Sequence, residues 1–330
     1  MSVHADAATV TPPGLDAAAL RHALVGAAGA AGSAGAPYTS LDVVEEIGST
    51  NAELLARAAD GAPDRSVLLA EYQATGRGRL GRVWTAPPRT QVAVSVLLRP
   101  GAVTPTLFGW LPLVTGLAVR DGLREAAGVE ATLKWPNDVL VSGRKLSGIL
   151  AEMTTVPAAG DFQVRLPAVV VGVGINVALT QDQLPVPHAT SLQLEGGSVD
   201  RTVVARAVLE ALARRHQQWR ECERGSGSTI SDELMDAYTQ ACSTIGAEVR
   251  VELPGDVVRV GRAVRVDREG RLVVVGKKEQ TSNPQTQDLR TNGDDDNGDA
   301  GTEEFAVAAG DVTHVRGAGG RWGAGGRWGG

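Results

Sequence analysis

A glycine- and arginine-rich segment directly after an apolar run places the strongest constraint on what this chain can fold into. Residues 71–84 read EYQATGRGRLGRVW and contain three arginines and three glycines: Arg77, Arg79 and Arg82, with Gly76, Gly78 and Gly81. The preceding run 66–70 predicts a buried strand. Glycine lets a backbone turn sharply and approach a ligand closely, and guanidinium groups supply forked donors suited to phosphate and carboxylate. The pattern therefore predicts a strand that ends in an anion-binding loop.

The alternative interpretation of this segment is an arginine- and glycine-rich surface loop or a nucleic-acid patch. Gln73 and Trp84 argue against it, because they bracket the arginines with an amide and an apolar wall. The whole chain also carries a formal charge of -6, with an isoelectric point near 5.5. An acidic protein is not a general nucleic-acid binder, so we expect a local anion site and no nucleic-acid partner.

Length and cysteine content limit the class of protein further. The 330 residues suffice for one large domain or two. Cys222 and Cys242 are the only cysteines, which gives no disulfide framework and no metal-ligand spacing. No apolar run is long enough to span a bilayer, and the N-terminus lacks a basic region followed by an apolar core. We therefore expect a cytoplasmic protein without a membrane partner.

The alternation of apolar runs predicts an α+β chain in four parts. Residues 1–40 form an Ala/Gly-rich segment with one short helix, and residues 41–244 carry most strands and helices. Residues 245–316 read as short strands of a small barrel, with a disordered insertion at 277–302, and the Gly/Arg/Trp tail 317–330 is also expected to be disordered. The predicted strands are 41–47, 66–70, 91–98, 130–135, 139–141, 145–153, 166–177, 248–253, 257–266, 271–275 and 304–308. The predicted helices are 15–25, 52–59, 110–126, 199–223 and 231–241.

A short polar motif precedes the helix at 52–59. Ser49, Thr50 and Asn51 follow a glycine, and Thr50 with Glu53 matches the capping-box pattern. These three residues are therefore either a simple helix start or part of a polar site.

A second cluster combines LKWPNDVL at 133–140 with GRKLSGIL at 143–150. It places Lys134, Asn137, Asp138 and Lys145 on or beside one hairpin. Only four of the 32 basic residues are lysine, so two lysines within twelve positions suggest a need for ammonium groups, although chance would also account for them. An Asn-Asp pair suits a hydrated Mg²⁺ that also binds substrate phosphates. Ordinary turn chemistry explains Pro-Asn-Asp equally well.

A third cluster, Gly172-Val173-Gly174-Ile175-Asn176, lies in the predicted strand 166–177. Its glycines would let the backbone lie against a ligand, and its amide would make a polar contact. Strand glycines can also mark only a close crossing of two elements.

Five motifs in this order, GSTN, EYQxxGRGRxGRxW, KWPND, RKLxGIL and GxGIN, resemble the biotin protein ligases, specifically the short form without an N-terminal DNA-binding domain. The resemblance covers roughly residues 41–316. It implies an α+β fold, in which a mixed β-sheet flanked by helices, of the class II synthetase-like biotin/lipoate ligase type, precedes a C-terminal SH3-like β-barrel.

The resemblance also implies a two-step reaction. The carboxylate of biotin attacks the α-phosphate of MgATP, which releases pyrophosphate and leaves biotinyl-5'-AMP. A lysine of a biotin carboxyl carrier domain of acyl-CoA carboxylases then attacks this mixed anhydride. ATP, Mg²⁺ and biotin are thus the expected small molecules, and no protein nucleophile is needed. His188, His216 and His314 are accordingly interpreted as structural.

Site roles follow from the matching motif positions. The biotin site is assigned to Ser49, Thr50, Asn51, Gln73, Arg77, Gly78, Arg79, Trp84, Lys145, Gly148 and Gly172, with Gly174 lining the same cavity. ATP and its phosphates are assigned to Arg79, Arg82, Lys134, Asn137 and Asn176, and the metal to Asp138. Lys145 and Arg77 are the catalytic residues, since they would stabilise charge between biotin carboxylate and α-phosphate. The arginine loop is expected to be open until ligand binds.

Three alternatives remain at this stage. A lipoate-protein ligase would share the fold, but KWPND together with GRGRxGR favours biotin. A biotin-sensing repressor would need a helix-turn-helix, for which residues 1–40 are too short and too rich in glycine and alanine. A non-catalytic biotin-binding relative would have no need of the phosphate-directed residues. The sequence does not decide between a monomer and a weak homodimer.

Overall fold

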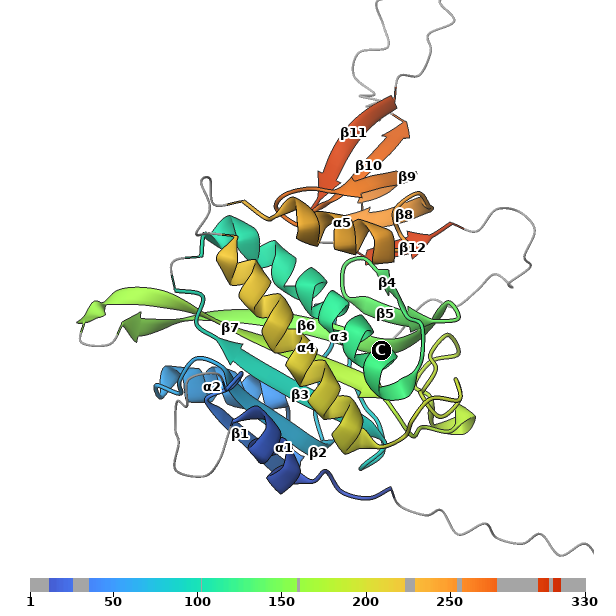
Figure 1. Cartoon of the computed structure of the whole chain (residues 1–330). Helices are drawn as coiled ribbons and strands as arrows, with labels where there is room; N and C mark the ends of the chain where they lie inside the picture. The colour runs from blue at the N-terminus through green and yellow to red at the C-terminus, as the bar shows by residue number, and fades with distance from the viewer. Residues whose placement is uncertain are drawn as a thin grey trace, which may run out of the picture. The chain divides into compact units, whose positions relative to one another are not determined.

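The computed structural model describes residues 12–25, 36–101, 103–158, 161–222, 229–253, 257–277, 302–308 and 311–315 (Figure 1). The expectations for the Gly-rich stretch at 26–35, for all but the ends of the insertion 277–302 and for the tail lie outside these residues. The chain divides into two compact units, Met1–Cys242 and Ser243–Gly330, which are described separately.

The first unit contains a seven-stranded sheet of order β1-β2-β3-β7-β6-β5-β4. β1 pairs with β2 in parallel and all other neighbours are antiparallel, which confirms the predicted mixed sheet. The strands are β1 Ser40–Ile47, β2 Ser66–Gln73, β3 Gln91–Leu98, β4 Thr132–Lys134, β5 Asp138–Val141, β6 Arg144–Ala158 and β7 Asp161–Asn176. β6 and β7 extend beyond the predicted 145–153 and 166–177 as a long two-stranded ribbon, visible in Figure 1.

Helices cover both faces of this sheet. α2 (Thr50–Ala59) buries Leu54 and Ala58 in a core with Val156 of β6 and Val170 of β7. α3 (Leu111–Ala127) lies on the opposite face, because its Gly116 approaches Ile149, whose side chain alternates away from Val156 along β6. α4 (Arg201–Glu221) packs along α3, and α5 (Asp232–Ala241) also contacts α3.

The start of α2 differs from the predicted capping box. Ser49, not Thr50, is the N-cap, and its Oγ accepts a hydrogen bond from the Ala52 amide at 3.4 Å. The Glu53 carboxylate accepts instead from Arg57, at 2.8 Å. The Thr50 hydroxyl contacts side chains of the sheet, so it is not free to cap the helix.

Within the first unit, the N-terminal segment is held against β2 and α4 by hydrogen bonds to a buried ion pair. Arg201 of α4 and Glu71 of β2 lie 2.6 Å apart, with side chains 2% and 4% exposed. Glu71 also accepts from the Leu15 amide at 2.5 Å, and Arg201 donates to the Pro13 carbonyl at 2.5 Å. The predicted helix follows as α1 (Ala17–Leu24), which packs against α4 and β1.

The second unit is a five-stranded antiparallel sheet of order β11-β10-β9-β8-β12. Its strands are β8 Glu248–Leu253, β9 Val257–Val266, β10 Leu272–Lys277, β11 Thr302–Val307 and β12 Asp311–His314. The sequence did not predict β12. Among the described residues β11 and β12 are the two edges of the sheet and do not pair, so the structure has the expected antiparallel strands but not a closed barrel.

Within the described ranges, no helix combines the length and the apolar character needed to cross a membrane.

Candidate active site

The arginine loop after β2 folds back on itself as a narrow hairpin. The Gly78 amide donates to the Arg82 carbonyl at 2.7 Å, and the Trp84 amide donates to the Gly76 carbonyl at 2.9 Å. A 3-10 turn at Arg79–Gly81 forms its tip. A Cβ at position 76 would lie 2.3 Å from the Trp84 carbonyl oxygen, so the strands of the hairpin approach this closely only because glycine stands there.

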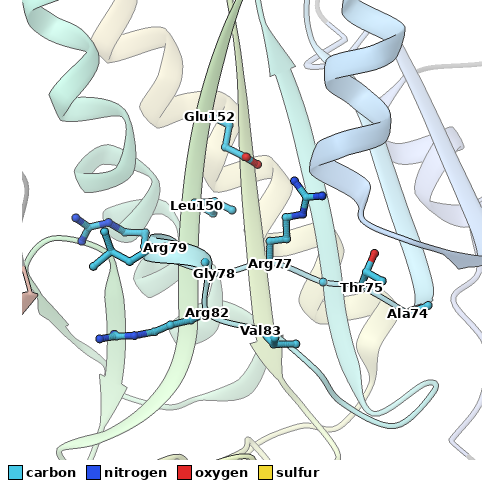
Figure 2. A pocket seen from close by; sticks show the side chains of 12 residues that line it. Ala74, Thr75, Arg77, Gly78, Arg79, Arg82, Val83, Leu150 and Glu152 are labelled. Carbon is cyan, nitrogen blue, oxygen red and sulfur yellow. The ribbon is translucent and has the colours of Figure 1, made fainter. Parts of the chain in front are cut away.

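The loop and β6 enclose a pocket of about 680 Å³. It is lined by residues 74–83 together with Leu150 and Glu152. Figure 2 shows Arg77 directed toward Glu152, whereas Arg79 and Arg82 extend in another direction. The three guanidinium groups therefore point to different sides of the loop.

The second motif lies beside this loop. Arg79 donates to Asn137 Oδ1 at 3.3 Å, and the same amide donates from Nδ2 to the Ile149 carbonyl at 2.9 Å. The orientation of Asn137 is thus set by β6, and its oxygen faces the loop. The arginine loop and the Asn-Asp turn are therefore adjacent in the structure.

Lys145 lies beside both Asp138 and Trp84. Its Nζ lies 2.6 Å from Asp138 Oδ1 and 5.6 Å from the centroid of the Trp84 ring. Lys134 is the β4 partner of Asp138 in the sheet register. Partial burial, together with the nearby Lys134 and Lys145 charges, lowers the pKa of the His188 imidazole. A cationic environment of this kind suits a ligand with several negative charges.

Small residues form the floor beneath Trp84. Gly148, Gly174 and Ala93 lie side by side in the register of β6, β7 and β3. A Cβ at Gly174 would lie 2.4 Å from Trp84 Cε2, and one at Gly148 would lie 3.0 Å from Trp84 Cζ3. The indole therefore rests directly on the sheet backbone. Its Nε1 donates to Gln91 Oε1 at 2.6 Å, which fixes the ring.

A buried polar network lies where α2 begins. The Thr50 amide donates to Gln73 Oε1 at 2.8 Å, and Thr50 Oγ1 lies 2.7 Å from Ser95 Oγ. Ser95 Oγ is also 2.6 Å from Asn51 Oδ1, and Asn51 Nδ2 donates to Glu152 at 2.8 Å. This network connects α2 with β2, β3 and β6.

Glycine at position 172 allows Asn51 to reach this network. A Cβ there would lie 2.2 Å from Asn51 Oδ1, a distance that no side chain could accommodate without displacing the amide. Gly172 and Ser95 are also partners in the register of β7 and β3.

Several predicted site residues, among them Ser49 and Asn176, make hydrogen bonds within the fold. Ser49 caps α2, and Asn176 donates to the Thr190 carbonyl at 2.9 Å while its side chain is 2% exposed. Two residues of the site were missed, Ser95 and Glu152. Ser95 is the one polar residue inside the apolar run 92–98, which is a signal that could have identified it.

Asp138 and Asn137 are the neighbouring oxygen-bearing side chains that could bind a metal ion here. The described residues hold no group of three or more His, Cys, Asp or Glu side chains that could bind an ion. Asp138 therefore offers one carboxylate beside the Asn137 amide. This donor set suits Mg²⁺, which keeps several waters and binds through substrate phosphates together with one or two carboxylates.

Comparison with known proteins identifies the class of protein in which this mixed sheet and arginine loop occur. Residues 44–176 match the model of the Biotin/lipoate A/B protein ligase family. The biotin--[acetyl-CoA-carboxylase] ligase of Mycobacterium tuberculosis is 40% identical over 315 residues, which cover 92% of this chain and 97% of the relative. The chain therefore belongs to the biotin protein ligases of this family.

Two further comparisons cover different parts of the chain. The bifunctional ligase/repressor BirA of Bacillus subtilis is 36% identical over 185 residues, which are 54% of this chain and 53% of that protein. The solved structure of the biotin protein ligase from Aquifex aeolicus in complex with biotin and ATP has a TM-score of 0.61 at 24% identity. This structural match covers 84% of this chain and all of the other, and it shows a shared fold.

Proposed function

We propose that the protein is a biotin-[biotin carboxyl-carrier protein] ligase. It activates biotin with MgATP to biotinyl-5'-AMP and transfers the biotinyl group to the amine of a lysine of a carrier domain, which forms an amide and releases AMP and a proton. The observation that carries this proposal is the close similarity to the mycobacterial ligase over nearly the full length of both chains, together with a cationic pocket of matching chemistry.

The first step is a displacement at phosphorus. A biotin carboxylate oxygen forms a bond to the α-phosphorus of ATP while the bond from that phosphorus to the bridging oxygen breaks, and pyrophosphate leaves with the electron pair. Both reactants are anions, so the protein has mainly to neutralise charge and align them. Lys145 and Arg77 are proposed for the reacting carboxylate and α-phosphate. Arg79 and Arg82 are proposed for the β- and γ-phosphates, with assistance from Lys134.

Magnesium would be held beside Asp138 and Asn137 and would supply further neutralisation of the triphosphate. The Lys145 ammonium already lies against the Asp138 carboxylate, so this ammonium is held in place before substrate binds. A cation positioned in advance requires little reorganisation when charge develops.

The biotin ring is proposed to bind at the polar end of the site. Thr50 and Gln73 would bond the ureido group, with Ser49 and Asn51 beside them. Trp84 would cover the valeryl chain, since its ring is fixed by Gln91 above the glycine floor. Gly78 would leave space for the ligand in the loop, whereas Gly148 and Gly174 let the Trp84 ring, and Gly172 the Asn51 amide, lie against the sheet beside the ligand. Asn176 would line the nucleotide side.

The second unit is proposed to correspond to an SH3-like barrel. The proposed protein partners are the carrier domains of acyl-CoA carboxylases, and no nucleic-acid partner is proposed. The protein is proposed to act as a monomer or weak homodimer. Sedimentation velocity across a range of protein concentrations would decide between these two states.

The test of the proposed function is ATP-pyrophosphate exchange by the purified protein with Mg²⁺, run in parallel with biotin, with lipoate and without acid. We expect exchange with biotin alone, followed by addition of one biotinyl group to an isolated carrier domain, seen by mass spectrometry. Exchange with lipoate alone would instead assign a lipoate-protein ligase. Absence of exchange with both acids would contradict the proposal and leave a binding protein.

A further inference from the structure

The polar network beneath α2 contains fewer hydroxyl protons than oxygen contacts. Three oxygen pairs lie within hydrogen-bonding distance: Ser95 Oγ with Asn51 Oδ1 at 2.6 Å, Ser95 Oγ with Thr50 Oγ1 at 2.7 Å, and Thr50 Oγ1 with Gln73 Oε1 at 3.0 Å. Each hydroxyl carries one proton, so the two hydroxyls can satisfy two of these three contacts. In one of the three pairs, the two oxygens must therefore face each other without a proton between them.

The direction of the network is set at its Glu152 end. Asn51 Nδ2 lies 2.8 Å from a Glu152 oxygen and 3.1 Å from the Leu150 carbonyl oxygen. A carboxylate and a carbonyl only accept, so the NH₂ group of Asn51 must face both of them and its Oδ1 must face Ser95. The orientation of the Asn51 amide is therefore determined by its partners.

The remaining protons follow from this orientation. Asn51 Oδ1 only accepts, so the Ser95 proton is directed to it, and Ser95 Oγ can then only accept from Thr50. The Thr50 proton could go to Ser95 Oγ at 2.7 Å or to Gln73 Oε1 at 3.0 Å, and we assign it to the shorter contact, which leaves the pair of Thr50 Oγ1 and Gln73 Oε1 without a proton. Gln73 Oε1 cannot be exchanged for the Nε2 group, because it accepts the Thr50 amide at 2.8 Å.

This arrangement makes the polar end of the site an acceptor of N–H groups. All four inner members of the network are buried, with Ser95 0%, Thr50 3%, Asn51 4% and Gln73 7% exposed. Water therefore has little access to relieve the contact between Thr50 and Gln73. A ligand N–H placed against these two oxygens would supply the missing proton, and the network adjoins the pocket through Glu152 and the segment that follows Gln73.

We propose that Glu152 and Ser95 are positioning residues that orient Thr50 and Gln73 as acceptors for an N–H donor of the biotin ureido ring. The inference rests on the proposed function, since it assigns the specificity of the same site. Neither residue needs to touch the reacting carboxylate or the phosphates. Their effect should accordingly appear in the KM for biotin and not in the KM for ATP.

The experiment uses steady-state biotin-dependent exchange in the full chain with the variants Glu152→Ala, Glu152→Gln and Ser95→Ala. Glu152→Ala and Ser95→Ala should raise the KM for biotin by roughly ten- to a hundredfold, the scale of an unsatisfied buried polar group, with little change in kcat or in the KM for ATP. Glu152→Gln should restore most of the affinity, because its amide oxygen can still accept from Asn51.

Two matched controls separate orientation from a general loss of stability. Ser147→Ala removes another fully buried hydroxyl from β6, one that has no hydrogen-bond partner, and should leave the KM for biotin unchanged. Glu46→Ala removes an exposed carboxylate from β1 and should also have no effect. Desthiobiotin keeps the ureido ring, so its KM should rise by the same factor as that of biotin in each network variant.

The outcomes distinguish the inference from the proposed function. No exchange by the wild-type protein would defeat the proposed function itself. Active wild-type protein with biotin KM values within twofold of normal in both Glu152→Ala and Ser95→Ala would overturn the positioning role alone. A fall in kcat at unchanged KM, matched by Ser147→Ala, would also overturn it by showing a merely structural effect.

Discussion

Lys145 Nζ lies 2.6 Å from Asp138 Oδ1 in a pair whose side chains are 24% and 20% exposed. The ammonium is thereby held at one position beside Trp84 before any substrate is present. We expect Lys145→Met to lower the rate of adenylate formation by about a hundredfold, the usual scale for one preorganised charge donor. Single-turnover formation of biotinyl-5'-AMP measures this rate directly.

The neighbouring Arg144 provides the control for this prediction. It lies on the same strand and pairs with Glu195 at 2.7 Å. Arg144→Met should therefore leave the single-turnover rate close to that of the wild type. An equal loss in both variants would mean that the effect is one of general charge and not of the Lys145 position.

The close contact between Gly174 and the Trp84 ring predicts an effect on biotin affinity. Gly174→Ala places a methyl group where the Trp84 ring now lies, at 2.4 Å from Cε2, so the indole must move from its contact with Gln91. We expect weaker biotin binding by at least about tenfold, as for a displaced ligand wall. Calorimetric titration with biotin gives the affinity. Gly116→Ala, whose methyl group would meet Leu133 at an ordinary 3.4 Å, should bind biotin normally.

The buried ion pair between Arg201 and Glu71 predicts a large effect on stability. Arg201→Met leaves the Glu71 carboxylate buried without its cation, and we expect a loss of about 3–5 kcal/mol in the free energy of unfolding. Urea unfolding followed by the fluorescence of the buried Trp110, Trp135 and Trp219 reports on this unit. Arg206→Met removes a cation that is 57% exposed from the same helix and should cost less than about 0.5 kcal/mol.

Much of the sheet and the identity of the main clusters could be predicted, because each depends on local pattern. The strand Gln91–Leu98 has the predicted bounds, and Asp138 and Lys145 share the predicted hairpin. These features follow from apolar periodicity, turn residues and close spacing in the sequence.

The missed features depend on contacts between distant segments. Ser95 meets Asn51 only because the register of β3 and β7 places it opposite Gly172. The anchoring of the N-terminal segment requires Arg201 and Glu71, which are 130 residues apart in the chain. Register and long-range pairing are not encoded in a local pattern, so the sequence could predict the motifs but not the network that connects α2 with the sheet.

The exposed arginines of the loop predict protection by ligand. Arg77 and Arg82 are exposed, and Leu80 at the tip is 71% exposed. We expect trypsin to cleave between residues 77 and 83 in the free protein and to cleave there at least about tenfold more slowly with biotin and ATP, as the loop closes over the adenylate. Peptide mapping by mass spectrometry gives both rates. Cleavage at Arg268, in the β9–β10 turn, serves as the internal control and should not change.

Finally, His216 predicts how the stability of the first unit depends on pH. Burial, with a smaller contribution from the Arg220 charge, lowers the pKa of this imidazole from 6.5 to about 3. Below pH 6.5 the unfolded chain therefore binds a proton that the folded protein does not, and the free energy of unfolding falls as the pH falls, by about 1.4 kcal/mol per pH unit. His216→Gln removes this component, so the variant should show a shallower decline between pH 6.5 and 5 in urea unfolding. The exposed His22, changed in the same way, should keep the wild-type slope, and an unchanged slope in His216→Gln would show that the imidazole is not held neutral by its burial.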